Sequence, residues 1–179
     1  MARRKWIGAF GGSFDPPHLG HLLAAVYALK VFELDEVWFV PAYQHAFGKK
    51  LSPFSKRLRM CRELIKGLGL KLKISTIERE IRSDGKMLRT LLALRKRHRH
   101  SRFSLVIGSD ILRQKRRWYR FSEIEKRFGI LVVPRGSAPA GNIAIPDVSS
   151  TEVRRRLRRR KPLDNLLTPA VAALWKRLT

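Results

Sequence analysis

GAFGGSFDPPHLGH, residues 8–21, is the stretch that decides the expected fold. It begins in a short apolar segment, Trp6–Phe10, and passes through the paired glycines Gly11 and Gly12. Two prolines then lead into His18–Phe32, which is apolar at helical spacing. A strand, a tight turn and a helix form the first unit of an open parallel sheet, whose ligands bind where the strands end. The stretch therefore predicts a binding site at its turn.

The rest of the chain continues the alternation of strands and helices. Further strands are expected at Glu36–Val40, Lys71–Ser75, Phe103–Ile107 and Ile130–Val133. Further helices are expected at Ser55–Leu68 with Ser55 as N-cap, Gly85–His98, Ser122–Phe128, Ser149–Arg160 and Thr168–Leu178. The pattern predicts an α/β fold, a Rossmann-like doubly wound parallel sheet with helices on both faces.

Composition narrows the function classes. Lys and Arg number 39 against 14 Asp and Glu, which gives a net charge of +25 and an affinity for polyanions. A solvated arginine-rich surface explains most of this charge, and a basic nucleic-acid-binding protein is the alternative. The one cysteine, Cys61, excludes an intrachain disulfide. No run of about 18 apolar residues and no signal-peptide core occurs, so we expect a cytoplasmic protein with no membrane partner.

The turn after the first strand has the features of a phosphate site. Gly11 and Gly12 have no Cβ, so the backbone can approach an anion closely. The following helix presents free N–H groups and a partial positive charge at its start. His18 and His21 lie three residues apart on its first turn, where each imidazole can donate to a phosphate oxygen.

A second anion site is predicted by VSSTEVR, residues 148–154. Ser149 and Glu152 fit a capping box, with Ser150 and Thr151 in the first turn and Arg154 on the same side. Two phosphate sites on two helix ends suit a polyphosphate held across the sheet. The reaction expected from this arrangement is nucleotidyl transfer, in which positioning and charge stabilisation supply the catalysis.

Several motifs resemble those of one enzyme family. GGSFDPPHLGH resembles the (H/T)xGH signature of the nucleotidyltransferase superfamily, and VSSTEVR resembles its ISSTxxR signature. GSDILRQKRRW, VVPRGS and LLTPAVAALW resemble the GxDxLxxLxxW, VxRPG and LLPxxVxxYI segments of bacterial nicotinate-nucleotide adenylyltransferases. The resemblance implies a single nucleotidyltransferase domain over residues 1–179. It also implies ATP and a mononucleotide acceptor as substrates, with Mg²⁺ bound through the ATP phosphates and no metal site made by the protein.

The resemblance also implies roles for individual residues. His18, His21 and Arg154 are the catalytic candidates, with His21 nearest the α-phosphate. Substrate-binding candidates are Gly11, Gly12, Ser13, Phe14, Lys49, Gly108, Asp110, Trp118, Arg135, Ser150 and Thr151. Asp110 would bind the ribose or adenine of ATP, and the Trp118 indole would stack on the pyridine ring.

The chain departs from the family on the acceptor side. GKMLRTL, residues 85–91, stands where the family has SYTxxTL, whose backbone recognises the nicotinate carboxylate. YQHAFGKK, residues 43–50, replaces the PPHK loop. Nicotinate mononucleotide, nicotinamide mononucleotide and another phosphorylated acceptor such as phosphopantetheine all stay open at this point.

Overall fold

The computed structural model describes residues 3–136 and 144–177. Five strands among them form one parallel sheet in the order β3-β2-β1-β4-β5. The strands are β1 (Lys5–Gly12), β2 (Glu36–Pro41), β3 (Leu72–Ile74), β4 (Ser101–Gly108) and β5 (Ile130–Val133). This order confirms the predicted doubly wound sheet. It also places the topological switch point between β1 and β4, where such sheets bind ligands.

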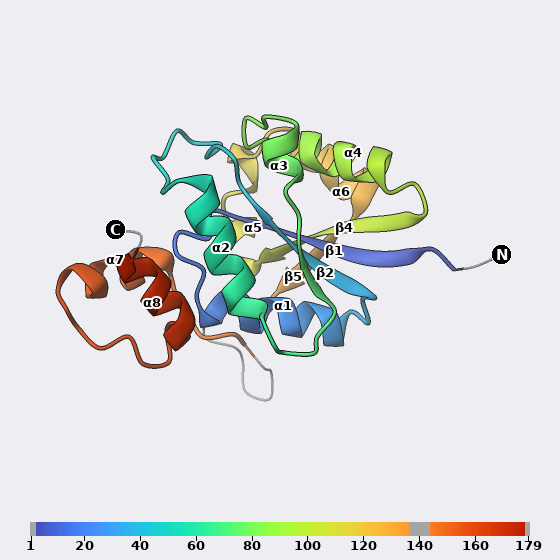
Figure 1. Cartoon of the computed structure of the whole chain (residues 1–179). Helices are drawn as coiled ribbons and strands as arrows, with labels where there is room; N and C mark the ends of the chain where they lie inside the picture. Colours follow the sequence, from blue (N-terminus) through green and yellow to red (C-terminus); the bar gives the residue numbers. More distant parts are fainter. Residues whose placement is uncertain (1–2, 137–143, 178–179) are drawn as a thin grey trace.

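Helices cover both faces of the sheet (Figure 1). One face carries α1 (Leu19–Val31), α2 (Phe54–Ile65), α7 (Ser150–Arg158) and α8 (Pro169–Arg177). The other carries α3 (Ile77–Glu80), α4 (Met87–Arg97) and α6 (Phe121–Phe128). Side chains alternate along β1 between the two faces of the sheet. Ile7 and Ala9 pack on the face that α3, α4 and α6 cover, and Phe10 packs on the face that α1 and α2 cover.

Most predicted elements agree with the structure within a few residues, and the differences have local causes. Ser55 is not the N-cap of α2, because Pro53 occupies that position and the helix has already begun at Phe54. The same helix ends at Ile65 rather than Leu68, because Gly67 adopts a φ of 74°. Leu178, the predicted last residue of the final helix, lies outside the described residues.

Three short elements were not predicted from the sequence. They are α3, α5 (Ser109–Leu112) and the 3₁₀ helix η1 (Lys115–Arg117). Each is too short to show an apolar periodicity. Both α5 and η1 follow the end of β4, so they lie at the edge of the sheet where the carboxyl ends of the strands meet.

Candidate active site

The two histidines of the first segment stack at the start of α1. His18 is the N-cap residue and is buried, and His21 lies in the first turn. The His18 backbone N–H donates to His21 Nδ1 at 3.2 Å, and the ring centroids are 3.6 Å apart. Because Nδ1 of His21 accepts this bond, the proton of its neutral ring resides on Nε2. His21 therefore offers an Nε2–H donor.

The surroundings of these rings keep both of them uncharged. Burial, and after it the nearby Arg135, lower the pKa of His18 to about 3. Burial, then His18, then Arg135 hold the pKa of His21 well below its usual value. Nδ1 of His18 is buried without a hydrogen-bond partner among the described residues. At neutral pH both imidazoles are thus uncharged and lie near the Arg135 cation.

The segment that precedes these histidines is supported from the protein core. Phe14 is buried, and its ring lies edge-on to the His21 ring with centroids 4.9 Å apart. The Phe14 side chain therefore packs against the His21 ring from the protein interior. Gly11 has a different neighbour, because a Cβ at this position would lie 2.1 Å from Cε of Met87. The bare backbone of Gly11 makes room for this side chain of α4.

The second predicted phosphate segment docks directly onto the first. Ser149 caps α7, since its hydroxyl accepts from the Glu152 N–H at 3.2 Å. Ser150 Oγ donates to the Pro16 carbonyl at 3.0 Å. Arg154 donates through Nη1 to the carbonyl of Asp15. The two helix N-termini are thus joined side by side.

Thr151 and Arg154 are linked within α7. The guanidinium of Arg154 donates through Nη2 to Thr151 Oγ1 at 3.2 Å. Thr151 is exposed, and its hydroxyl can still donate its own proton. Ser150, whose proton is directed at Pro16, serves in this arrangement as a link between two loops.

Arg135 joins the end of β4 to the segment before α7. Its Nη1 lies 3.6 Å from Asp110 Oδ1, and its Nη2 donates to the Val148 carbonyl at 2.7 Å. A Cβ at Gly108 would lie 2.3 Å from Asp110 Oδ1 and 2.6 Å from Arg135 Cδ. Gly108 thus leaves room for these two side chains, which cross over the end of its strand.

Two cavities flank this edge of the sheet. A pocket of about 500 Å³, which we call the sheet-edge pocket, is lined by Gly11, Gly12, Ser13, Met87, Trp118 and other side chains. A larger cleft of about 840 Å³, the cationic cleft, is lined by Asp15, Lys49, Lys50, Arg154, Arg158 and Lys176, among others. Lys49 thus lies on the same side as Arg154, and Trp118 lies in the sheet-edge pocket.

Arg57 is a buried residue of this region that the sequence did not reveal. It is 1% exposed and donates to three carbonyls, those of Ser52 at 2.9 Å, Ser13 at 2.8 Å and Ala42 at 2.7 Å. It thereby ties the glycine turn, the end of β2 and the lysine-bearing loop together. A cation in an amphipathic basic helix looks like a surface residue, so no sequence pattern marks Arg57 as buried.

Asp15 is a second buried polar residue of this region whose surroundings no sequence pattern predicts. Its carboxylate is buried, and Oδ2 accepts from the Ser52 N–H at 3.0 Å. Oδ1 is buried with no hydrogen-bond partner among the described residues.

No group of three or more His, Cys, Asp or Glu within residues 3–136 and 144–177 could hold a metal ion. Within those ranges no helix is long and apolar enough to cross a membrane.

Comparison with known proteins identifies the class. Residues 9–156 match the cytidylyltransferase-like family. In fold, the chain is similar to the Plasmodium falciparum nicotinic acid mononucleotide adenylyltransferase complexed with NaAD, with a TM-score of 0.74 and 19% identity over 97% of this chain and 95% of that one. The fold and its paired helix ends thus define a nucleotidyltransferase of the cytidylyltransferase-like class.

Closer relatives narrow the family. The chain is 40% identical over 176 residues to a protein of Anaeromyxobacter dehalogenans, covering 96% of this chain and 94% of the relative. It is 41% identical over 174 residues to one of Myxococcus xanthus, covering 96% and 91%. Both carry the name probable nicotinate-nucleotide adenylyltransferase. The chain belongs to the nicotinate-nucleotide adenylyltransferase family, which confirms the resemblance and favours an enzyme over a nucleic-acid-binding protein.

Proposed function

We propose that this protein transfers the adenylyl group of ATP to nicotinate mononucleotide, releasing pyrophosphate and forming the dinucleotide precursor of NAD. The docking of two helix N-termini carries this proposal, since Arg154 of α7 donates to the Asp15 carbonyl next to the histidine pair. Anions bind at such helix ends. The sheet-edge pocket, with Trp118 in its wall, opens beside them and offers a place for the acceptor.

The bond changes require no general base. An anionic phosphate oxygen of the acceptor forms a bond to the α-phosphorus of ATP, and the bond from this phosphorus to the α,β-bridging oxygen breaks. The electron pair leaves with pyrophosphate. The residues therefore have to position the two phosphates and stabilise the charge that develops between them.

Each group at the site has a part in this scheme. His21, with its Nε2–H donor fixed by the bond to the His18 N–H, donates to the α-phosphate. Arg154, Thr151 and the first N–H groups of α7 hold the leaving phosphates, and Lys49 meets them from the other wall of the cationic cleft. Asp110, which follows β4, and Arg135, which follows β5, bind the nucleoside part of ATP.

We infer that Mg²⁺ enters bound to the ATP phosphates. The donor set fits this mode, because the described residues contain no cluster of three acidic, histidine or cysteine ligands. Magnesium commonly keeps several water ligands and binds through substrate phosphates. The ion supplies charge neutralisation on the triphosphate, and the protein's own cations and N–H groups supply the orientation.

The experiment is pyrophosphate release from Mg-ATP, with nicotinate mononucleotide, nicotinamide mononucleotide and phosphopantetheine offered in parallel. Mass spectrometry identifies the adenylylated product. We expect release with nicotinate mononucleotide and a product that contains both nucleotides. If no pyrophosphate is released with any of the three acceptors, in a sample that still binds ATP by calorimetry, the proposed acceptor is contradicted.

A further inference from the structure

A lysine stands in the acceptor side of the site where the family motif has an uncharged residue. Lys86 is the N-cap residue of α4 and lines the sheet-edge pocket. Its Nζ lies 5.2 Å from the centroid of the Tyr119 ring, which lines the same pocket beside Trp118. The family has SYTxxTL where this chain has GKMLRTL, so Lys86 stands at the position of the tyrosine in that motif.

The other charged groups of the pocket are already engaged. Glu78 is 1% exposed, and its two oxygens accept from the Thr90 hydroxyl and from the Tyr43 N–H. Arg117 packs its guanidinium against the Phe47 ring, 4.5 Å from the ring centroid. Burial and then Lys49 lower the pKa of His45, which leaves that imidazole neutral at pH 7. The lining therefore carries positive charge from Lys86 and Arg117, and Lys86 supplies the cation at the start of α4.

Lys86 can turn to a ligand without leaving Asp84, its present ion-pair partner, unpaired. Its Nζ lies 2.8 Å from Asp84 Oδ2, and Arg89 Nη1 lies 2.8 Å from the same oxygen. Asp84 thus stays paired with Arg89 when Lys86 moves away. Both pairs are partly exposed and are individually weak, so exchanging one for a ligand carboxylate costs little.

The backbone adds a second positive contribution at the same place. Helix α4 begins at Met87, directly after Lys86, and Met87 also lines the pocket. The first N–H groups of a helix have no intrahelical acceptor and carry the positive end of its dipole. A flat anion lying against Trp118 and Tyr119 would meet the lysine and this helix end together.

We infer that Lys86 is a specificity-determining residue that favours an acceptor whose pyridine ring carries a carboxylate over one that carries a carboxamide. This inference rests on the proposed function and names the group that selects between its two pyridine acceptors. A neutral carboxamide gains no charge-assisted bond from Lys86 and places its own NH₂ donors against a cation.

The test compares kcat/KM for nicotinate and nicotinamide mononucleotides in four proteins: wild type, Lys86→Gln, Lys86→Arg and Lys96→Gln. Lys96 is an exposed residue near the far end of α4 and serves as the matched control. Lys86→Gln should lower kcat/KM for nicotinate mononucleotide about 10- to 100-fold, the size of one lost charged hydrogen bond. The loss should fall on the KM for that acceptor, with the KM for ATP unchanged.

The outcomes separate the inference from the proposed function. We expect Lys86→Gln to change turnover of nicotinamide mononucleotide less than threefold, Lys86→Arg to keep most of the preference, and Lys96→Gln to match wild type. An unchanged acceptor ratio in a folded Lys86→Gln protein overturns the role of Lys86 alone. Wild type that adenylylates neither pyridine nucleotide overturns the proposed function, and the inference with it.

Discussion

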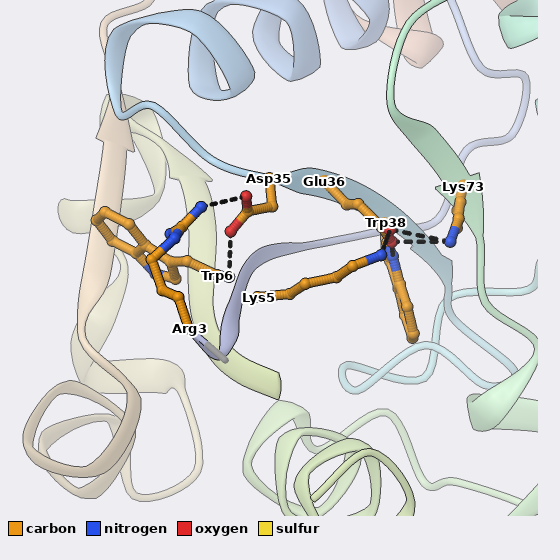
Figure 2. A network of polar contacts seen from close by, with 7 residues as sticks. All are labelled: Arg3, Lys5, Trp6, Asp35, Glu36, Trp38 and Lys73. Atoms are coloured by element: carbon orange, nitrogen blue, oxygen red, sulfur yellow. Dashed lines mark hydrogen bonds and ion pairs between the residues drawn. The ribbon is translucent and has the colours of Figure 1, made fainter. Parts of the chain in front are cut away.

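The two edges of the parallel sheet use polar groups in opposite ways. At the amino edge, Glu36 accepts from Trp38 Nε1 at 2.7 Å and pairs with Lys5 and Lys73, each at 3.0 Å (Figure 2). Beside it, Asp35 accepts from the Trp6 N–H at 2.7 Å. The carboxylates of this edge thus have partners within the protein.

At the carboxyl edge, buried polar atoms are left without partners. Among the described residues, three such atoms lie there, namely Asp15 Oδ1, His18 Nδ1 and Arg135 Nε. The fourth atom of this kind, Glu123 Oε2, lies in α6 and is 2.7 Å from Arg120 Nε in an ion pair. Unpaired buried groups cost stability, so their concentration at one edge indicates a surface built for a ligand.

Polar groups with partners inside the protein thus serve stability, including Arg57 at the carboxyl edge, and the groups left unpaired are available to a ligand. Substitutions at the amino edge should lower the free energy of unfolding and leave turnover intact. Substitutions among the phosphate-binding groups should do the reverse.

The largest effect is expected from His21→Ala. This change removes the Nε2–H donor from the α-phosphate, and kcat should fall about 10²-fold or more, as for other lost transition-state donors. Steady-state pyrophosphate release measures it. His100→Ala, which changes an exposed histidine after α4, serves as the control and should leave kcat unchanged. Near-normal turnover in His21→Ala would remove His21 from its assigned role.

Arg57→Met should give the next largest effect, this time on stability. It leaves the carbonyls of Ser13, Ala42 and Ser52 without their donor, and the free energy of unfolding should fall by about 3 kcal/mol. Urea denaturation measures the change. Arg59→Met, at an exposed position of the same helix, should change it by less than about 0.5 kcal/mol. Equal losses in both variants would contradict the structural role of Arg57.

Glu36→Gln should lower stability by about 2 kcal/mol without affecting kcat, because it weakens charged hydrogen bonds at the amino edge. The pH dependence gives a further signature. Burial opposes ionisation of Glu36, but hydrogen bonds from Trp38, Lys5 and Lys73 outweigh it and lower the pKa from 4.5 to about 2. Its stabilising contribution is therefore complete above about pH 4.5 and is lost as the pH falls toward 2.

Urea titrations between pH 7 and pH 3 compare the two proteins. Wild type should lose its advantage over Glu36→Gln as the pH falls through this range, because the unfolded state binds the proton first. A difference that stays constant down to pH 3 would show that the ionised carboxylate is not the stabilising species.

The last prediction is that the rings of His18 and His21 do not titrate near neutral pH in the folded protein. His18 has a pKa of about 3 and that of His21 lies well below its usual value, mainly because both rings are buried. Their ring NMR signals should not move between pH 5 and 8. In urea-unfolded protein the same rings should titrate with a midpoint at pH of about 6.5. A native midpoint near 6.5 would mean that the pair is charged in part at neutral pH.

Much of this architecture follows from local patterns in the sequence. The stretch with Gly11, Gly12, His18 and His21 predicts its own strand, turn and helix, because each of these features is encoded within a few neighbouring residues. The Ser149 cap of α7 was predicted for the same reason and is confirmed. Five parallel strands followed from the alternation of apolar segments.

What the sequence did not reveal depends on contacts between distant segments. Arg57 bonds to residues 5, 15 and 44 positions away, so no local pattern marks it as buried. The docking of Ser150 on Pro16 spans 134 positions. The packing of the buried Phe14 ring against His21 likewise depends on how the turn folds back onto α1, and no local pattern predicts it.

The most direct test of the contrast between the two edges is one ¹H–¹⁵N NMR titration of the protein with Mg-ATP. The ring signals of His18 and His21 should shift, while the indole N–H signals of Trp6 and Trp38 at the amino edge stay in place. That result would show that the groups left unpaired at the carboxyl edge receive the nucleotide. Shifts of the Trp38 signal with unmoved histidines would contradict the assignment of the site.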